Sequence, residues 1–230
     1  MSRNTDHTIQ NRLGITSDAG AWCTIGKIPE PPSDVRQTAG AKSLRPAFIR
    51  PLGLLGLTFA SPFILILALL TLIAAGEETL KKWLATGEER ERLQTADLDI
   101  KRRDEAIVEL GLDKTFDGDW NGAAGQFLLR WYTRSSHHKR FVMLSGERIL
   151  LAAPPKRVSV RAESRMCIVA EIPAGEAILE DLLPAYENNK LRIRFKDGSW
   201  IALTTKEMRS DLHKHLMRRP QTGGSKSTQA

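Results

Sequence analysis

An uncharged, strongly apolar run dominates the hydropathy pattern of this chain. Residues 52–76 contain no charged side chain, and fourteen of these 25 residues are Leu, Ile or Phe. As a helix the run would be about 37 Å long, which exceeds the roughly 30 Å of hydrocarbon in a bilayer. Backbone groups inside a bilayer must hydrogen-bond to one another, so the pattern predicts a single transmembrane helix over residues 51–76. A re-entrant hairpin that turns at Ser61–Pro62 is the alternative.

The charges around this run do not indicate its direction. Four Lys or Arg side chains lie in the twenty residues before the run, and four lie in the twenty after it. Orientation normally follows an excess of these side chains on one side. We predict a single-pass protein of the cell membrane with its folded C-terminal domain in the cytoplasm. The opposite orientation would place that domain outside the cytoplasm.

Both ends of the chain lack a regular apolar pattern. Residues 1–50 contain four prolines and many other turn formers, so they predict a disordered N-terminal tail. Residues 219–230 predict a second disordered tail. Trp22-Cys23 and Ile25 form a small apolar island in the first tail. We interpret the island as incidental, with a docking motif as the alternative.

A highly charged segment without proline follows the apolar run. Residues 77–112 predict a juxtamembrane helix that would act as a stalk. Leu93, Ile100 and Ile107 recur every seven residues, but Arg103 interrupts the second row of the heptad. The segment is interpreted as a solvated spacer, and a homodimer formed through residues 93–110 is the alternative.

Between residues 113 and 218 the pattern changes to short apolar runs separated by turn residues, which is typical of strands. Ser145-Gly146-Glu147 has the composition of a tight turn, and Pro173-Ala174-Gly175 ends another run. The strands predicted before the last hairpin are Gln126–Thr133, Arg140–Leu144, Arg148–Ala152, Arg157–Arg161 and Met166–Ile172.

The clearest strand signal is a hairpin near the C-terminus. Three apolar residues of residues 191–196 alternate with Arg192, Arg194 and Lys196, which predicts one apolar and one basic face. Asp197-Gly198 favours a two-residue turn. That turn would place Phe195 opposite Trp200, and Ile193 opposite Ala202.

A helix is predicted after the hairpin. Thr204 and Glu207 have the spacing of a capping box, with Thr204 as the N-cap. Met208, Leu212 and Leu216 then form one apolar stripe on a helix of about thirteen residues.

This order of elements resembles that of bacterial pleckstrin-homology-like (PH-like) domains. The likeness covers residues 115–218 and rests on Ile172-Pro173-Ala174-Gly175-Glu176, on the segment 194–200 and on the following helix. It implies about seven strands in a partly open barrel that a C-terminal helix closes. The predicted fold class is therefore one transmembrane helix plus an α+β or all-β domain of this kind, over residues 113–218.

The resemblance also implies a binding or scaffolding module rather than an enzyme. Lipid-binding members carry basic residues around the first hairpin. The matching candidates here, together with those of the last hairpin, are Arg130, Arg134, Lys139, Arg140, Arg192 and Arg194. They are candidates for binding a protein partner or anionic lipid, and the alternative is that they solvate the exterior of a barrel. Lys139 and Arg140 are adjacent, so on a strand they would point in opposite directions.

Composition and motifs narrow the function further. The net charge of +7 is spread along the chain, without the clustered basic stripe of a nucleic-acid-binding protein. No catalytic, metal-binding or cofactor motif is present, so no enzyme is predicted. The predicted function is a single-pass membrane adaptor or scaffold that presents a PH-like domain to protein partners. A bitopic component of a secretion, conjugation or division machine, with its domain outside the cytoplasm, is the alternative.

Overall fold

The computed structural model describes residues 9, 11–38, 71, 87–131, 135, 137, 139–155 and 162–218. The chain divides into two compact units, residues 1–46 with 106–230 and residues 47–105. The strands are β1 (Ala19–Thr24), β2 (Lys139–Ser145), β3 (Arg148–Ala153), β4 (Cys167–Ile172), β5 (Ala177–Glu180), β6 (Lys190–Phe195) and β7 (Trp200–Thr205). The helices are α2 (Ser33–Thr38), α4 (Gly87–Glu109), α5 (Ala123–Trp131), the short 3-10 helix η1 (Ala162–Arg165) and α6 (Asp211–Arg218).

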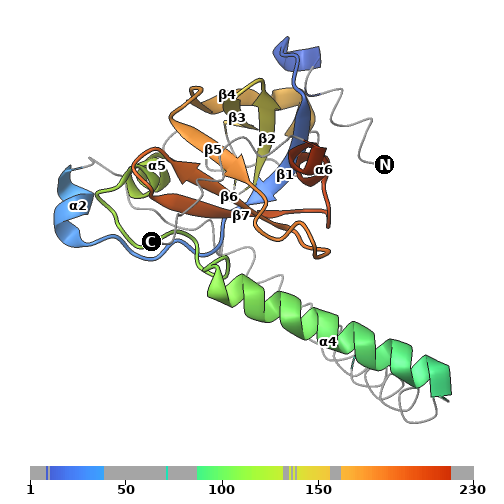
Figure 1. Cartoon of the computed structure of the whole chain (residues 1–230). Coiled ribbons are helices and arrows are strands. Elements are labelled where there is room, and N and C mark those ends of the chain that lie inside the picture. The colour runs from blue at the N-terminus through green and yellow to red at the C-terminus, as the bar shows by residue number, and fades with distance from the viewer. Residues whose placement is uncertain are drawn as a thin grey trace, which may run out of the picture. The chain divides into compact units, whose positions relative to one another are not determined.

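The seven strands of the first unit form one antiparallel sheet in the order β4-β3-β2-β1-β7-β6-β5. The central strand, β1, comes from the N-terminal part of the chain, and all others follow residue 138. It pairs with β2 along its whole length, from Ala19 opposite Leu144 to Thr24 opposite Lys139, and its end pairs with β7. Figure 1 shows β1 in blue between strands of the C-terminal half. The prediction of a disordered tail over residues 1–50 is therefore wrong for β1, which includes the Trp22-Cys23 island.

Small residues explain why the sequence pattern of β1 is weak. A Cβ atom on Gly20 would lie 2.8 Å from the ring of Phe141 on β2, so a side chain at this position would clash with the ring. Ala19 and Ala21 are buried on the opposite face of the strand. The strand is held by its position between two partners, and its first three residues, Ala19, Gly20 and Ala21, are too small to give the pattern that normally marks a strand.

The position of β1 also rules out the predicted single crossing of a membrane. Residues 52–76 lie between β1 and β2 in the chain and, apart from Thr71, outside the described residues, as does the alternative hairpin at Ser61–Pro62. Because β1 and β2 pair in one sheet, both flanks of the run lie on the same side of any membrane, whereas one crossing would separate them. Within the described ranges, no helix is long and apolar enough to cross a membrane.

The transmembrane part of the predicted fold class is therefore wrong, and so is the single-pass localisation in the cell membrane. The alternative, a bitopic protein with its domain outside the cytoplasm, also needs a single crossing. The pairing of β1 with β2 is therefore incompatible with it as well. Instead, the described residues form a seven-stranded antiparallel sheet with a few helices. This sheet neither confirms nor excludes the resemblance to PH-like domains.

One face of the sheet, called the inner face here, packs against the main hydrophobic core. Alternate residues of every strand point to this face, as the period of two requires. Helix α5 contributes Leu128 and Leu129, and helix α6, which lies beside β1 in Figure 1, contributes Leu212. The two helices thus close the core on the inner side of the sheet.

The opposite side, the outer face, is covered in two places. Residues 9–15 pack on an apolar cluster that includes Phe141, Met143 and Leu150 of β2 and β3. Residues 106–112 and 182–186 pack on Trp200 and Ala202 of β7. The outer face of β5 and β6 is exposed at Ile178 and Arg194.

The predicted strand Gln126–Thr133 is wrong, because its first six residues belong to helix α5. The N-terminus of this helix is capped by the β6–β7 turn: Ala123 N–H donates to Asp197 Oδ2 at 2.7 Å, and Ala124 N–H donates to Ser199 Oγ at 3.0 Å. These caps come from more than seventy residues away, so no local capping signal was present. The hydrogen bonds from Ala123 and Ser199 lower the pKa of Asp197.

The hairpin predictions are confirmed with one change of register. β2, β3 and β4 match the predicted runs that begin at residues 140, 148 and 166. In the last hairpin, Ile193 lies opposite Ile201, not Ala202. Phe195 N–H donates to Ser199 O at 2.8 Å, so Phe195 does not pair with Trp200, and the loop has three residues that end in Gly198. Gly198 has a φ of 89°, which suits the three-residue hairpin loop.

The C-terminal helix begins later than predicted. Thr204 is not an N-cap, because it and Thr205 extend β7, and Lys206 N–H donates to Trp22 O on β1. Helix α6 therefore has eight residues and starts at Asp211. Met208 lies before it, exposed, while Leu212 and Leu216 of the predicted stripe face the core.

The charged segment after the apolar run forms a helix, as predicted, over the part that is described. Helix α4 has 23 residues and buries none of them. Residues 77–86, the predicted strand Arg157–Arg161 and the tail at 219–230 lie outside the described residues. Dimerisation through residues 93–110 stays a prediction.

The central position of β1 predicts that a fragment without it does not fold. Residues 106–230 alone should show no cooperative unfolding, because both β2 and β7 would lose a hydrogen-bonded neighbour. Adding residues 1–46 as a separate chain should restore a cooperative transition, measured by circular dichroism during urea unfolding.

A matched control uses the same N-terminal chain with Gly20→Val. The added side chain would meet the Phe141 ring, so this chain should not restore folding. A fragment of residues 106–230 that folds cooperatively by itself would contradict the prediction.

Candidate functional site

The outer face of β6 carries a row of basic residues, which we call the basic strip: Lys190, Arg192 and Arg194. Between them, Leu191, Ile193 and Phe195 point to the inner face and are buried in the main core. The strand is therefore fixed by its apolar side, and the basic residues share the other side. The predicted basic face is confirmed for Arg192 and Arg194, whereas Lys196, which was predicted with them, lies in the turn after β6, and Lys190 was not predicted.

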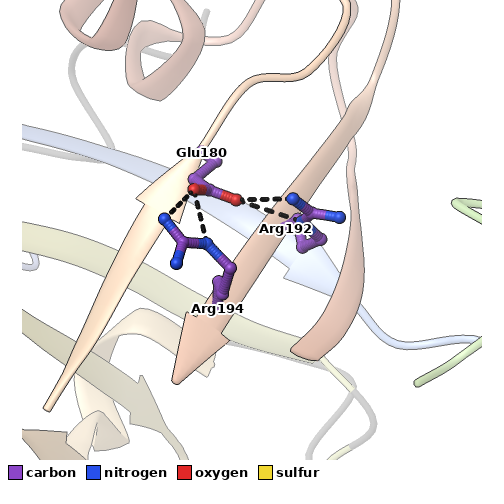
Figure 2. Close-up of polar contacts among 3 residues, drawn as sticks. All are labelled: Glu180, Arg192 and Arg194. Carbon is purple, nitrogen blue, oxygen red and sulfur yellow. Dashed lines mark hydrogen bonds and ion pairs between the residues drawn. The ribbon is translucent and has the colours of Figure 1, made fainter. Parts of the chain in front are cut away.

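Glu180 of β5 lies between the two arginines of the strip (Figure 2). Its Oε2 accepts hydrogen bonds from Arg192 Nε at 3.1 Å and Nη2 at 2.9 Å. Its Oε1 lies 2.8 Å from both Nε and Nη2 of Arg194. Glu180 is directly opposite Arg192 in the β5–β6 register, which explains why one carboxylate reaches both guanidinium groups. Position 180 carried no separate signal in the sequence, because its role depends on that register.

The charges of this cluster do not balance. One carboxylate is shared by two guanidinium groups, and each guanidinium directs only Nε and Nη2 toward it. The Arg194 side chain is 44% exposed, whereas those of Arg192 and Glu180 are 19% exposed. The cluster therefore has one excess positive charge and, on each arginine, an Nη1 group that Glu180 does not use.

Lys190 lies at the less accessible end of the basic strip. Its Nζ donates to Thr204 Oγ1 of β7 at 3.0 Å. Burial lowers the pKa of Lys190, and the nearby Asp113 opposes that shift. Lys190 therefore contributes positive charge but has a partner already, so the two arginines are the main binding groups.

Large apolar side chains lie on both sides of Arg194. Ile178 of β5 and Trp200 of β7 are its direct neighbours across the sheet. Ile178 is 46% exposed, and Trp200 is partly buried against the cover formed by residues 106–112. Arg and Trp are enriched among the few residues that contribute most of the binding energy of a protein interface.

The remaining predicted site residues do not gather into one group. Arg130 is exposed at the end of α5, which is a helix and not the first strand. Arg134 lies outside the described residues. Lys139 is half-buried on β2, in a row with Thr24 and Thr204 that leads across the sheet to Lys190. Three strand spacings separate it from Lys190, about 14 Å.

Arg140 is a structural residue. Its guanidinium is buried and lies over the Trp131 ring, with Cζ 4.5 Å from the ring centroid. It donates to backbone carbonyls, among them those of Trp131 and Ser135. As predicted from their adjacency, Lys139 and Arg140 point to opposite faces. The predicted basic group around the first hairpin is thus divided between a helix, a strand and the core.

A Ser–His pair near α6 invites comparison with a hydrolytic dyad. Ser210 Oγ lies 2.8 Å from His213 Nδ1, and His213 Nε2 lies 3.2 Å from the carbonyl oxygen of Lys190. A carbonyl only accepts, so Nε2 carries the proton and Ser210 donates to Nδ1. Both residues are buried, which keeps a substrate from the hydroxyl, and the pair instead ties α6 to β6.

Among the described residues, no group of three or more His, Cys, Asp or Glu side chains could hold a metal ion. Comparison of the chain with protein-family models, curated proteins and solved structures gives no match. The candidate site is therefore argued from its geometry alone.

The buried His213 predicts a loss of stability in mild acid. Burial lowers the pKa of His213 in the folded state, and Asp181 and the hydrogen bond to Lys190 O only partly oppose this. The unfolded chain has the higher pKa, near 6.5, and gains the proton first. Stability should therefore be complete above that value and decrease as the pH falls below it.

Urea unfolding at pH 7.5 and pH 5 measures this effect. His213→Gln should reduce the difference between the two pH values, whereas His215→Gln on the same helix should leave it unchanged. An equal pH dependence in the His213 variant would contradict the assignment.

Proposed function

We propose that this chain is a non-enzymatic binding protein, an adaptor whose sheet domain recognises a protein partner through the outer face of β5 and β6. The observation that carries the proposal is the sharing of one carboxylate, Glu180, by Arg192 and Arg194 at an exposed part of the sheet. Two guanidinium groups that are held in place and incompletely neutralised favour an anionic group on a partner. The resemblance to PH-like domains supports the same class of function.

The neighbours of the cluster favour a protein over a small anion. Ile178 offers exposed apolar surface beside Arg194, and Trp200 borders it on the other side. A protein segment can bury such apolar surface and pair with the guanidinium groups at once. A small anion would use only the charges.

Anionic lipid is a weaker candidate for this surface. The basic residues that the resemblance offered for a lipid headgroup are not brought together, since Arg140 is buried and Arg130 belongs to α5. Binding to a lipid surface gains from several basic side chains that can approach one plane. The two arginines of the strip are too few for that mode, and they suit recognition of individual carboxylates.

The proposal predicts that a partner contacts Ile178. A photoreactive residue placed at position 178 in the full chain should give a discrete crosslinked product in cells that express it. Arg192→Gln with Arg194→Gln should remove the product, because the partner would lose both charge-assisted contacts. Crosslinked products are measured by gel mobility and mass spectrometry.

Two controls come from β3 and from the turn before it. Arg148→Gln removes an exposed arginine that pairs with Glu171, so it changes the net charge at a different place and should leave the product unchanged. A photoreactive residue at Glu147 tests the exposed β2–β3 turn, which should give no such product. Equal products from positions 178 and 147, or a product that survives the double variant, would contradict the proposal.

A further inference from the structure

We infer that the basic strip binds an extended, acidic segment of its partner, in which carboxylates alternate with neutral residues. This inference rests on the proposed function and adds the chemistry and spacing of the ligand. It follows from the spacing of the arginines, the width of the exposed surface and the unused hydrogen-bond donors.

The spacing of the strip is that of alternate residues on a strand. Arg192 and Arg194 are two residues apart on β6 and lie on the same face, as does Lys190 two residues earlier. Alternate residues of a strand are about 7 Å apart. An extended ligand that runs along β6 repeats its side chains at the same interval, so two alternate carboxylates stay in step with the two arginines. Side chains three or four positions apart on a helix are about 5–6 Å apart and lose step along the row.

The exposed surface is also narrow. Leu110, Leu112 and Tyr186 belong to the cover over β7, and β5 is the last strand of the sheet on the other side. The available outer face is therefore that of β5 and β6, two strands about 5 Å apart. An extended chain fits over two strands, whereas a helix is about 10–12 Å across.

The donors that face away from Glu180 suit a second set of carboxylates. Each arginine uses Nε and Nη2 for Glu180, and the Nη1 group of each is not needed for that contact. Glu180 holds the two guanidinium groups in position before a ligand arrives, which reduces the side-chain entropy lost on binding. Glu180 is a positioning residue. Together with Lys190, the two arginines carry two more positive charges than Glu180 balances, so two partner carboxylates would neutralise the strip.

Two peptides of identical composition test the inference against the full chain. One has acids at every second position, Ser-Glu-Thr-Glu-Thr-Glu-Ser, and the other has them at every third position, Glu-Ser-Thr-Glu-Thr-Ser-Glu, so that successive acids of an extended chain point to opposite faces. Each carries a fluorescent label, and binding is measured by fluorescence anisotropy at low ionic strength. The alternating peptide should bind about five-fold more tightly, since it keeps one more ion pair in register.

Variants locate the binding on the strip. Arg194→Gln should weaken binding of the alternating peptide about five-fold and so remove the difference between the two peptides, and adding Arg192→Gln should weaken the binding of both. Arg148→Gln, the matched loss of charge on β3, should change neither affinity. Circular dichroism of each variant checks that the sheet is retained.

The outcomes separate this inference from the proposed function. Equal affinities for the two peptides, or tighter binding of the one with acids at every third position, would overturn the extended alternating ligand. If the crosslink from position 178 still depended on the arginines, the proposed function would stand. A preference for the alternating peptide that persists in the double variant would also overturn the inference, because the spacing would then be detected elsewhere.

Discussion

The pairing of β1 with both β2 and β7 is the interaction on which the rest of the domain depends. Without it, the sheet would separate into β2–β4 and β5–β7, each with a free edge in place of its central neighbour. More than one hundred residues lie between β1 and β2 in the chain, so the sheet joins segments that are remote in sequence. The same pairing keeps the two flanks of the apolar run at 52–76 on one side, which is why a single membrane crossing is incompatible with this fold.

The last hairpin links that sheet to the candidate site. On its inner side, Ile193 and Phe195 are buried in the core, and its turn supplies the carboxylate of Asp197 that caps α5. On its outer side, the same strand presents Arg192 and Arg194 to Glu180. Anchoring by the core and by the helix cap fixes the backbone of β6, so the positions of the two guanidinium groups follow from the fold and not from their own flexible side chains.

Sequence reasoning succeeded where the pattern is local and failed where a distant segment decides the structure. The alternation in residues 191–196 was enough to predict a strand with one basic face. Strand β1 was missed because its first half, Ala19 to Ala21, consists of small residues with little pattern, and Gly20 must be small to lie against the Phe141 ring. Helix α5 was taken for a strand because its cap comes from Asp197 and Ser199. The pairing of Glu180 with two arginines depends on strand register, which spacing in the sequence does not give.

The position of an arginine in the fold, and not its presence in the sequence, separates a binding residue from a structural one. Arg140 was predicted as a site residue alongside Arg194, yet its guanidinium is enclosed by Trp131 and backbone carbonyls. Both Nη groups of Arg140 donate hydrogen bonds to backbone carbonyls of the protein itself. Arg194 shares the carboxylate of Glu180 with a second arginine and is partly open to solvent. Charge that the fold leaves incompletely balanced is available to a partner, and in the described part of the domain this condition is met by the arginines of β6.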